Sequence, residues 1–130
     1  MPTTNDTFLV LVDLQDKLAR SMDEQERLIE NCRRAVRCAL ALNLPIVWTE
    51  QLPDKLGPTL PEVAEWLPDR HPIIKSSFGC CGSAEFVDAV EQTGGHRALI
   101  AGIETHVCVY QTAAELLQRG LQVEVLADAV

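Results

Sequence analysis

The chain of 130 residues has a formal net charge of −8 and is 47% hydrophobic and 23% charged, which is typical of one soluble globular domain. This negative charge, with no long run of Lys or Arg, argues against nucleic acid and membrane surfaces as partners and favours a small neutral or cationic substrate. The five cysteines include no C-x-x-C pair, and no export signal or membrane-spanning stretch is present, so we expect reduced thiols in a cytoplasmic protein.

The first part of the chain alternates strand and helix patterns. Residues 8–12 form a continuous apolar run that ends at Asp13, as in a strand buried on both faces of a parallel sheet. Residues 21–24 have the pattern of a capping box, and residues 46–48 predict a second short strand. Between them, apolar residues at helical spacing predict an amphipathic helix: Leu28, Cys32, Ala35, Val36 and Ala39.

A proline-rich stretch from residue 52 to 72 predicts a long loop, with one helical turn around residues 62–66. Loops of this length often cover a functional site, but a packed structural excursion is equally consistent with the pattern. Residues 72–74 predict the third strand, which runs into Lys75.

The remaining chain continues the alternation. Ser83 is expected to cap a helix over residues 84–92, residues 97–101 predict the fourth strand, and residues 121–126 predict the fifth. The helix between these two strands is expected to carry four residues on one face: Val107, Tyr110, Ala114 and Leu117. Strands that alternate with helices predict an α/β fold, a three-layer, doubly wound parallel sheet with helices on both faces.

Three reactive side chains follow three of these strands. In such sheets ligands bind at the carboxyl ends of the strands, and Asp13, Lys75 and Cys108 follow the first, third and fourth strands. Cys108 also lies in the first turn of a predicted helix, where free backbone N–H groups and the helix dipole favour a thiolate. We therefore predict a site in which Cys108 attacks an acyl carbon, Asp13 takes its proton and Lys75 balances the charge. Backbone N–H groups of Glu104 and Cys108 are candidates for an oxyanion hole.

Each of these residues also has an ordinary structural interpretation. Asp13 could cap a turn, Lys75 could be a solvated lysine, and Cys108 could be a small buried hydrophobe. His106 is a rival base, but residues two apart on a helix do not face each other.

The other histidines and cysteines give weaker signals. His71 and His96 lack paired ligand spacing, so we expect no metal and no cofactor. Cys80 and Cys81 could serve redox or metal chemistry, or only line a site.

Three segments carry a family resemblance: residues 13–15, Lys75 and residues 102–109. With them the chain resembles the isochorismatase-like cysteine hydrolases, which include nicotinamidases and carbamoylsarcosine amidases. The resemblance implies a triad of Asp13, Lys75 and Cys108, cleavage of the C–N bond of a small amide through a thioester, and a cis peptide near residues 103–104. The candidates for the substrate pocket are Gln15, Phe78 and Thr105.

The chain departs from the family at two places. Nicotinamidases carry an Asp-x-His metal motif after the second strand, whereas residues 49–53 contain no histidine. Members of the family usually continue with another helix and strand, so residues 1–130 are expected to be one domain without its C-terminal helix and strand. Residues 49–51 and 56–59 resemble the isochorismatase domain-containing subgroup, whose substrates are poorly defined.

Two other functions remain open beside the hydrolase. The chain could be a catalytically silent, oligomeric binding or scaffold protein, or a thiol redox protein that uses Cys80, Cys81 and Cys108. We expect a homo-oligomer, either a dimer or a tetramer.

Overall fold

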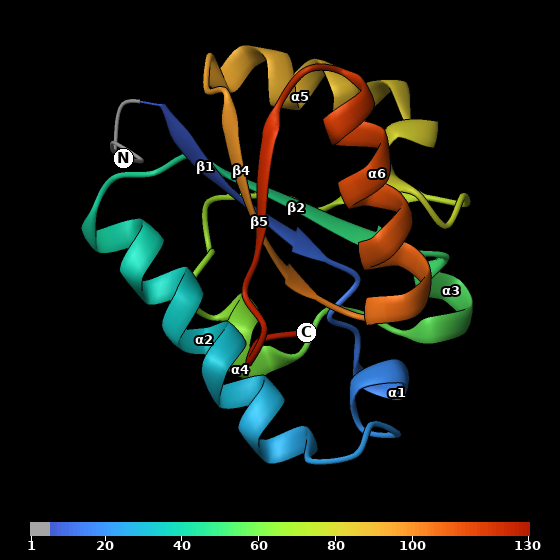
Figure 1. The fold of residues 1–130 in the computed structure, drawn as a ribbon. Coiled ribbons are helices and arrows are strands. Elements are labelled where there is room, and N and C mark those ends of the chain that lie inside the picture. The colour runs from blue at the N-terminus through green and yellow to red at the C-terminus, as the bar shows by residue number, and fades with distance from the viewer. Residues whose placement is uncertain (1–5) are drawn as a thin grey trace.

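Five parallel strands form one sheet in the computed structural model, which describes residues 6–130 (Figure 1). The strand order is β3-β2-β1-β4-β5. Strands β2 and β3 are added on one side of β1, and strands β4 and β5 on its other side. The strand order therefore reverses between β1 and β4. The strands are β1 (Thr7–Val12), β2 (Ile46–Gln51), β3 (Ile73–Lys75), β4 (Arg97–Gly102) and β5 (Gln122–Val125).

Strand β1 is the centre of the sheet, and all six of its residues are buried. Val10 pairs with Val47 of β2 on one side and with Ile100 of β4 on the other. Because side chains alternate along a strand, Leu9 and Leu11 belong to the core on one face, whereas the other core contains Phe8, Val10 and Val12. The continuous apolar pattern of this segment is thus explained by burial on both faces.

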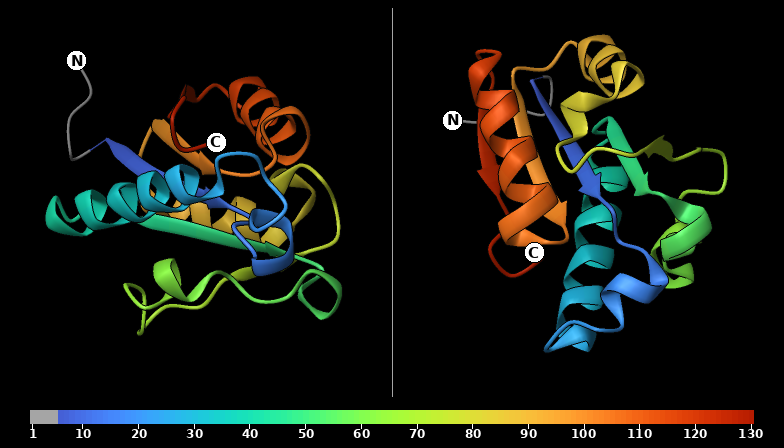
Figure 2. Two further views of the ribbon diagram at one scale, coloured as in Figure 1. Left: turned by 90° about the horizontal axis from the view of Figure 1, so that it is seen from below. Right: turned by 90° about the vertical axis from the view of Figure 1, so that its right-hand side faces the viewer.

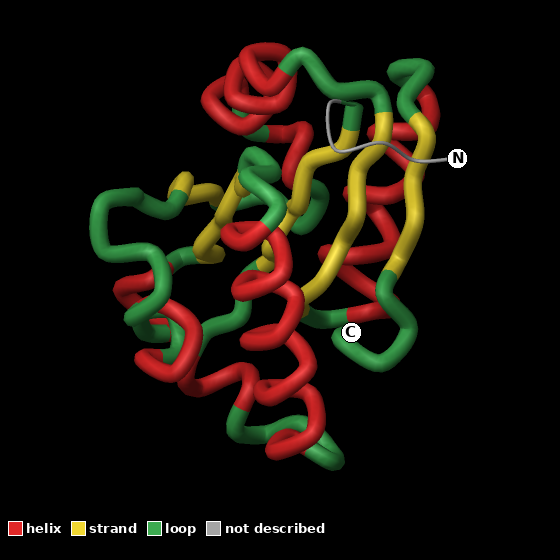
Figure 3. The backbone as a smooth tube through the Cα atoms, turned by 90° about the vertical axis from the view of Figure 1, so that its left-hand side faces the viewer, coloured by secondary structure: helices red, strands yellow, loops and turns green. Residues whose placement is uncertain are grey.

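Helices cover both faces of the sheet (Figures 1 and 2). Helix α2 (Gln25–Ala41) packs on one face, and in Figure 3 it lies in front of the strands. Helices α5 (Ala84–Thr93) and α6 (Tyr110–Gln118) pack on the other. This confirms the predicted three-layer, doubly wound α/β fold. The buried face of α2 consists of Leu28, Ile29, Cys32, Val36 and Ala39.

Short helical segments occupy several connections. They are α1 (Asp16–Ala19), α3 (Pro53–Leu56), α4 (Pro61–Ala64), the 3-10 turn η1 (Cys80–Gly82) and the π-helical turn η2 (Thr105–Val109). The predicted single turn around residues 62–66 was incomplete, because the connection from β2 to β3 holds both α3 and α4. Each of these begins with proline, which fits a first helical turn because that position needs no N–H partner.

The predicted capping box at residues 21–24 is wrong. Helix α2 begins at Gln25, and its N-cap, Glu24, has a φ of 52° and no side-chain capping bond. Ser21 Oγ instead donates to the carbonyl of Leu18 at 2.7 Å, within the turn after α1. The predicted Ser83 cap is confirmed, since its hydroxyl oxygen accepts a hydrogen bond from the N–H of Phe86 at the start of α5.

The predicted apolar face of the helix after β4 is wrong at two of its four residues, while Val107 and Ala114 are partly buried. Tyr110 and Leu117 are 66% and 57% exposed, whereas Val109, Thr112 and Leu116 are buried. The π-helical turn explains this shift, because the N–H of Val109 bonds to the carbonyl of Glu104 five residues back. The extra residue in that turn rotates the face that α6 presents to the sheet.

No helix within residues 6–130 is long and apolar enough to cross a membrane.

Candidate active site

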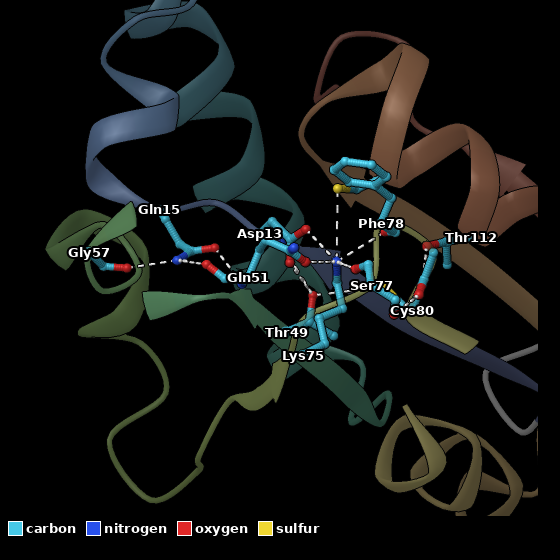
Figure 4. Close-up of polar contacts among 12 residues, drawn as sticks. Asp13, Gln15, Thr49, Gln51, Gly57, Lys75, Ser77, Phe78, Cys80 and Thr112 are labelled. Carbon is cyan, nitrogen blue, oxygen red and sulfur yellow. Dashed lines mark hydrogen bonds and ion pairs between the residues drawn. The ribbon is translucent and has the colours of Figure 1, made fainter. Parts of the chain in front are cut away.

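Asp13, Lys75 and Cys108 lie together at the carboxyl edge of the sheet. Figure 4 shows Asp13 and Lys75 with the residues that hold them. Asp13 directly follows β1, Lys75 is the last residue of β3, and Cys108 lies in η2 after β4. Lys75 Nζ is 2.8 Å from Asp13 Oδ2 and 3.8 Å from Cys108 Sγ. All three residues are buried, with at most 5% of their surface exposed. The structure therefore brings the three predicted residues into contact, although strand β2 lies between the strands that carry Asp13 and Lys75.

A close approach of two strand ends brings the Asp13 and Cys108 segments together. Gly102, at the end of β4, has a φ of 122°, and a Cβ atom there would collide with the backbone of Val12. The next N–H, of Ile103, bonds to the carbonyl of Val12 at 2.9 Å. Glycine is required here because it alone combines this backbone conformation with so close an approach.

The Asp13 carboxylate is held by two partners on its two oxygens. Thr49 Oγ1 donates to Asp13 Oδ1 at 2.9 Å and accepts from the Asp13 N–H at 3.3 Å. Asp13 Oδ2 faces Lys75 in the ion pair. The threonine on β2 thus fixes the orientation of the carboxylate, a role that the sequence analysis missed.

The Lys75 ammonium is surrounded by oxygen atoms. Besides Asp13, it donates to Gln51 Oε1 at 2.7 Å and to the carbonyl oxygens of Ser77 at 2.8 Å and Phe78 at 3.0 Å. A buried ammonium needs such partners, because desolvation of an unpaired charge is costly. The loop after β3 therefore wraps around its own lysine and fixes it beside the thiol.

The Cys108 thiol is protonated at neutral pH. Burial raises the pKa of Cys108 to about 11, and a hydrogen bond to Asp13 and its negative charge add to this effect. The positive charge of Lys75 and a backbone hydrogen bond from Glu104 act in the opposite direction but do not outweigh it. The expectation that the helix start would stabilise a thiolate in the resting protein is therefore wrong, because burial and the carboxylate dominate. The thiol instead lies beside a carboxylate that can accept its proton.

The predicted cis peptide is present between Ile103 and Glu104. It lies between β4 and η2, next to the backbone N–H of Glu104 that bonds to the thiol.

The isochorismatase domain model matches residues 7–130. The chain belongs to the isochorismatase family. It is 33% identical over 129 residues to isochorismatase domain-containing protein 2 of Danio rerio and 38% identical over 129 residues to that of Bos taurus. These matches cover 98% and 95% of this chain but only 64% and 58% of the relatives, so the chain spans less than two thirds of their length.

Two solved structures have the same fold. The first, described as the MAR1 ribonuclease of Caenorhabditis elegans, is 36% identical with a TM-score of 0.91, over 99% of this chain and 66% of that one. The second, YcaC of Escherichia coli, described as an octameric hydrolase of unknown specificity, is 30% identical with a TM-score of 0.93, over 98% of this chain and 65% of that one. The fold of these isochorismatase-like proteins is thus shared along nearly the whole chain.

The three predicted pocket residues of this isochorismatase-family chain lie in different surroundings. Gln15 is fully buried, and its amide bonds to the backbone of Gln51 and to the carbonyl of Gly57. Phe78 is 58% exposed, and its carbonyl binds Lys75. Thr105 is exposed and lines a separate cavity of about 320 Å³ beside Glu104. Contact of these three residues with a substrate stays a prediction.

The end of β2, where nicotinamidases carry their metal motif, holds the following loop in this chain. Glu50 Oε2 accepts from the Thr59 N–H at 2.8 Å and from the Thr59 hydroxyl at 2.7 Å, and Trp48 Nε1 donates to the same hydroxyl at 2.8 Å. Across residues 6–130, no three His, Cys, Asp or Glu side chains gather in a way that could hold a metal ion.

All five cysteines are free thiols. Cys80 is fully buried below the site, with Sγ 3.9 Å from Thr49 Oγ1, and burial raises its pKa to about 12. Cys81 is partly buried, and burial raises its pKa as well. Burial thus raises the pKa of both thiols of the vicinal pair, and Cys80 packs against the threonine that orients Asp13.

Proposed function

We propose that this isochorismatase-family chain is a cysteine-dependent hydrolase that cleaves the C–N bond of a small amide through a thioester, without a metal ion. The observation that carries this proposal is the buried contact of Asp13, Lys75 and Cys108 at distances of 2.8 and 3.8 Å. A nucleophile, a base and a fixed cation in mutual contact at a sheet edge are the groups that acyl transfer requires.

In the proposed reaction, Asp13 takes the proton of the Cys108 thiol as the sulfur attacks the amide carbon. The carbonyl oxygen becomes an oxyanion, which the backbone N–H groups of Glu104 and Cys108 would stabilise. Asp13 then returns the proton to the leaving nitrogen, the C–N bond breaks and a thioester remains on Cys108. Water, deprotonated by Asp13, attacks this thioester, which releases the carboxylic acid and restores the thiol.

Lys75 has an electrostatic role in this scheme. When the proton moves from the thiol to Asp13, the negative charge moves from the carboxylate to the sulfur. Lys75 Nζ lies 2.8 Å from Asp13 Oδ2 and 3.8 Å from Cys108 Sγ, so the same cation faces the negative charge before and after the transfer and stabilises the sulfur anion.

One solved relative supports a reactive nucleophile in this fold. YcaC of Pseudomonas aeruginosa, 32% identical with a TM-score of 0.87, is described with covalent acrylamide, a compound to which thiolates add. We do not propose the ribonuclease activity that the description of the Caenorhabditis elegans relative names. The net charge of −8 of this chain opposes binding to the negatively charged backbone of RNA.

We also propose a homo-oligomer and a reducing compartment, the cytoplasm. The octameric state in the description of Escherichia coli YcaC supports an oligomer, although the sequence analysis expected a dimer or tetramer. Five free thiols support a reducing environment.

A panel of small amides screened for ammonia or amine release tests the proposed function. We expect at least one amide to be turned over, with loss of turnover in Cys108→Ala and retention in Cys38→Ala, since Cys38 is an exposed residue of α2. A catalytically silent scaffold would turn over none of the panel, and equal turnover in both variants would exclude Cys108 as the nucleophile.

A further inference from the structure

Gln51 is the last residue of β2, the strand between those that carry Asp13 and Lys75. It pairs in register with Lys75 on β3, and its side-chain Oε1 accepts a hydrogen bond from Lys75 Nζ at 2.7 Å (Figure 4). The residue is 7% exposed. Gln51 therefore contacts the lysine directly.

The backbone of Gln51 is held by a second glutamine. Gln15 Oε1 accepts from the Gln51 N–H at 2.6 Å, and Gln15 Nε2 donates to the Gln51 carbonyl at 2.9 Å and to the Gly57 carbonyl at 2.7 Å. Because an ammonium can only donate, the oxygen of the Gln51 side chain must face Lys75. Both the main chain and the amide orientation of Gln51 are thus fixed.

The Lys75 ammonium has more partners than it has protons. It contacts the oxygens of Gln51, Ser77 and Phe78 and the sulfur of Cys108, and the ion pair with Asp13 is a fifth contact, whereas an ammonium donates three hydrogen bonds. Loss of the Gln51 acceptor would leave enough partners to satisfy the buried charge, so the fold does not depend on it. What would change is the position of the Lys75 ammonium relative to the Cys108 sulfur.

We propose that Gln51 is a positioning residue, which acts through Lys75 to hold its positive charge against Cys108. This inference rests on the proposed function, in which Lys75 stabilises the sulfur anion. The side chain is suited to this role because an amide oxygen anchors the ammonium without adding a second negative charge beside the thiol, as a glutamate would.

The test measures the pH dependence of Cys108 alkylation by iodoacetamide, which needs no substrate. Cleavage after Arg97 and Arg119 releases peptide 98–119, in which Cys108 is the sole cysteine, so mass mapping follows this thiol alone. The variants are Gln51→Met, Gln51→Glu, Lys75→Met and the double variant with Met at both positions. Gln118→Met, an exposed glutamine at the end of α6, is the matched control.

We expect Gln51→Met to raise the apparent pKa of Cys108 and to slow alkylation at neutral pH several-fold, because a loosely held cation stabilises a thiolate less than a fixed one. Lys75→Met should slow it further, since each unit of pKa is worth about tenfold in thiolate at constant pH. In the Lys75→Met background, Gln51→Met should add nothing, because its partner is gone. Gln51→Glu should also slow alkylation, and Gln118→Met should match the wild type.

Two results would overturn the inference. One is an unchanged pH dependence of Cys108 alkylation in Gln51→Met. The other is that Gln51→Met shifts the apparent pKa of Cys108 equally in the wild-type and Lys75→Met backgrounds. If Gln51→Met does not fold, Gln51→Asn carries the test, because its shorter side chain keeps a polar amide but withdraws the oxygen from Lys75, and an unchanged pH dependence of Cys108 alkylation there has the same meaning. Failure of this inference can be told apart from failure of the proposed function. If Gln51→Met slows alkylation of Cys108 but no amide is cleaved, the proposed function fails; if amides are cleaved but Gln51→Met leaves alkylation unchanged, only the role of Gln51 fails.

Discussion

Asp13 and Lys75 form an ion pair of 2.8 Å in which both side chains are completely buried. Asp13 directly follows β1 and Lys75 ends β3, and strand β2 lies between these two strands. A buried pair repays its desolvation only when hydrogen bonds satisfy the remaining groups, and here Thr49 and Gln51, both on β2, supply them. The strand between the two charged residues thus supports both.

Removing either partner of this pair should destabilise the chain. Asp13→Asn and Lys75→Met are each expected to lower the free energy of unfolding by about 3 to 5 kcal/mol, because each leaves a buried charge without its counterion. The variant with both changes should lose less than the sum of the two. Urea unfolding measures these values, and strictly additive losses would show that the ion pair does not couple the two residues.

The same two residues should shift the Cys108 pKa in opposite directions. From a value of about 11, Lys75→Ala should raise it, because the thiolate would face Asp13 without compensation, and Asp13→Asn should lower it, because a neighbouring anion is removed. A raised thiol pKa favours the neutral, protonated form, so alkylation at neutral pH should slow in the first variant and accelerate in the second. Shifts of the same sign in both would contradict the assigned roles.

The five thiols should differ in reactivity according to exposure and pKa. With limiting iodoacetamide at neutral pH, exposed Cys38 should react first, and the fully buried Cys32 and Cys80, whose pKa values burial raises to about 12, should react last. Cys108, which is 5% exposed, and the partly buried Cys81 should lie between these groups. Peptide mapping gives the order, and early modification of Cys32 would show that α2 does not bury it as described.

Metal removal should leave turnover unchanged. The Glu50 carboxylate is bonded to Thr59, and the proposed steps use only side chains and backbone N–H groups of the chain itself. Once a substrate is known, exhaustive chelation and the addition of zinc or iron can be compared directly. Activity that is lost to the chelator and restored by one of these ions would contradict the metal-independent mechanism.

The sequence predicted the sheet well because its signals are local. The apolar run at residues 8–12 marks a strand buried on both faces, and the strand at residues 97–101 was found in the same way. The predicted end of β2 at residue 48 was too early, since Thr49, Glu50 and Gln51 continue the strand by pairing with β3. Polar residues weaken an apolar pattern even where the backbone pairing continues.

The supporting residues of the site could not be found in this way. Thr49 bonds to Asp13, which lies 36 positions away, and Gln51 bonds to Lys75, which lies 24 positions away. A threonine or glutamine near the end of a strand has many ordinary roles, so neither contact could be predicted. The π-helical turn around Cys108 was missed for a related reason, because its extra residue leaves no signal in the spacing of apolar residues. The signal that did exist was positional: Thr49 and Gln51 lie within the last three residues of β2, at the edge where the charged residues were expected.

If the proposed reaction is right, Cys108 carries an acyl group during turnover. Acid quenching of the protein during cleavage of an amide, followed by mass analysis of peptide 98–119, would detect it. We expect this peptide to gain the mass of the acyl group at Cys108 in the wild type, and Cys108→Ala neither to gain it nor to turn over the amide. An acyl group on another cysteine peptide, or undiminished turnover in Cys108→Ala, would rule out Cys108 as the nucleophile.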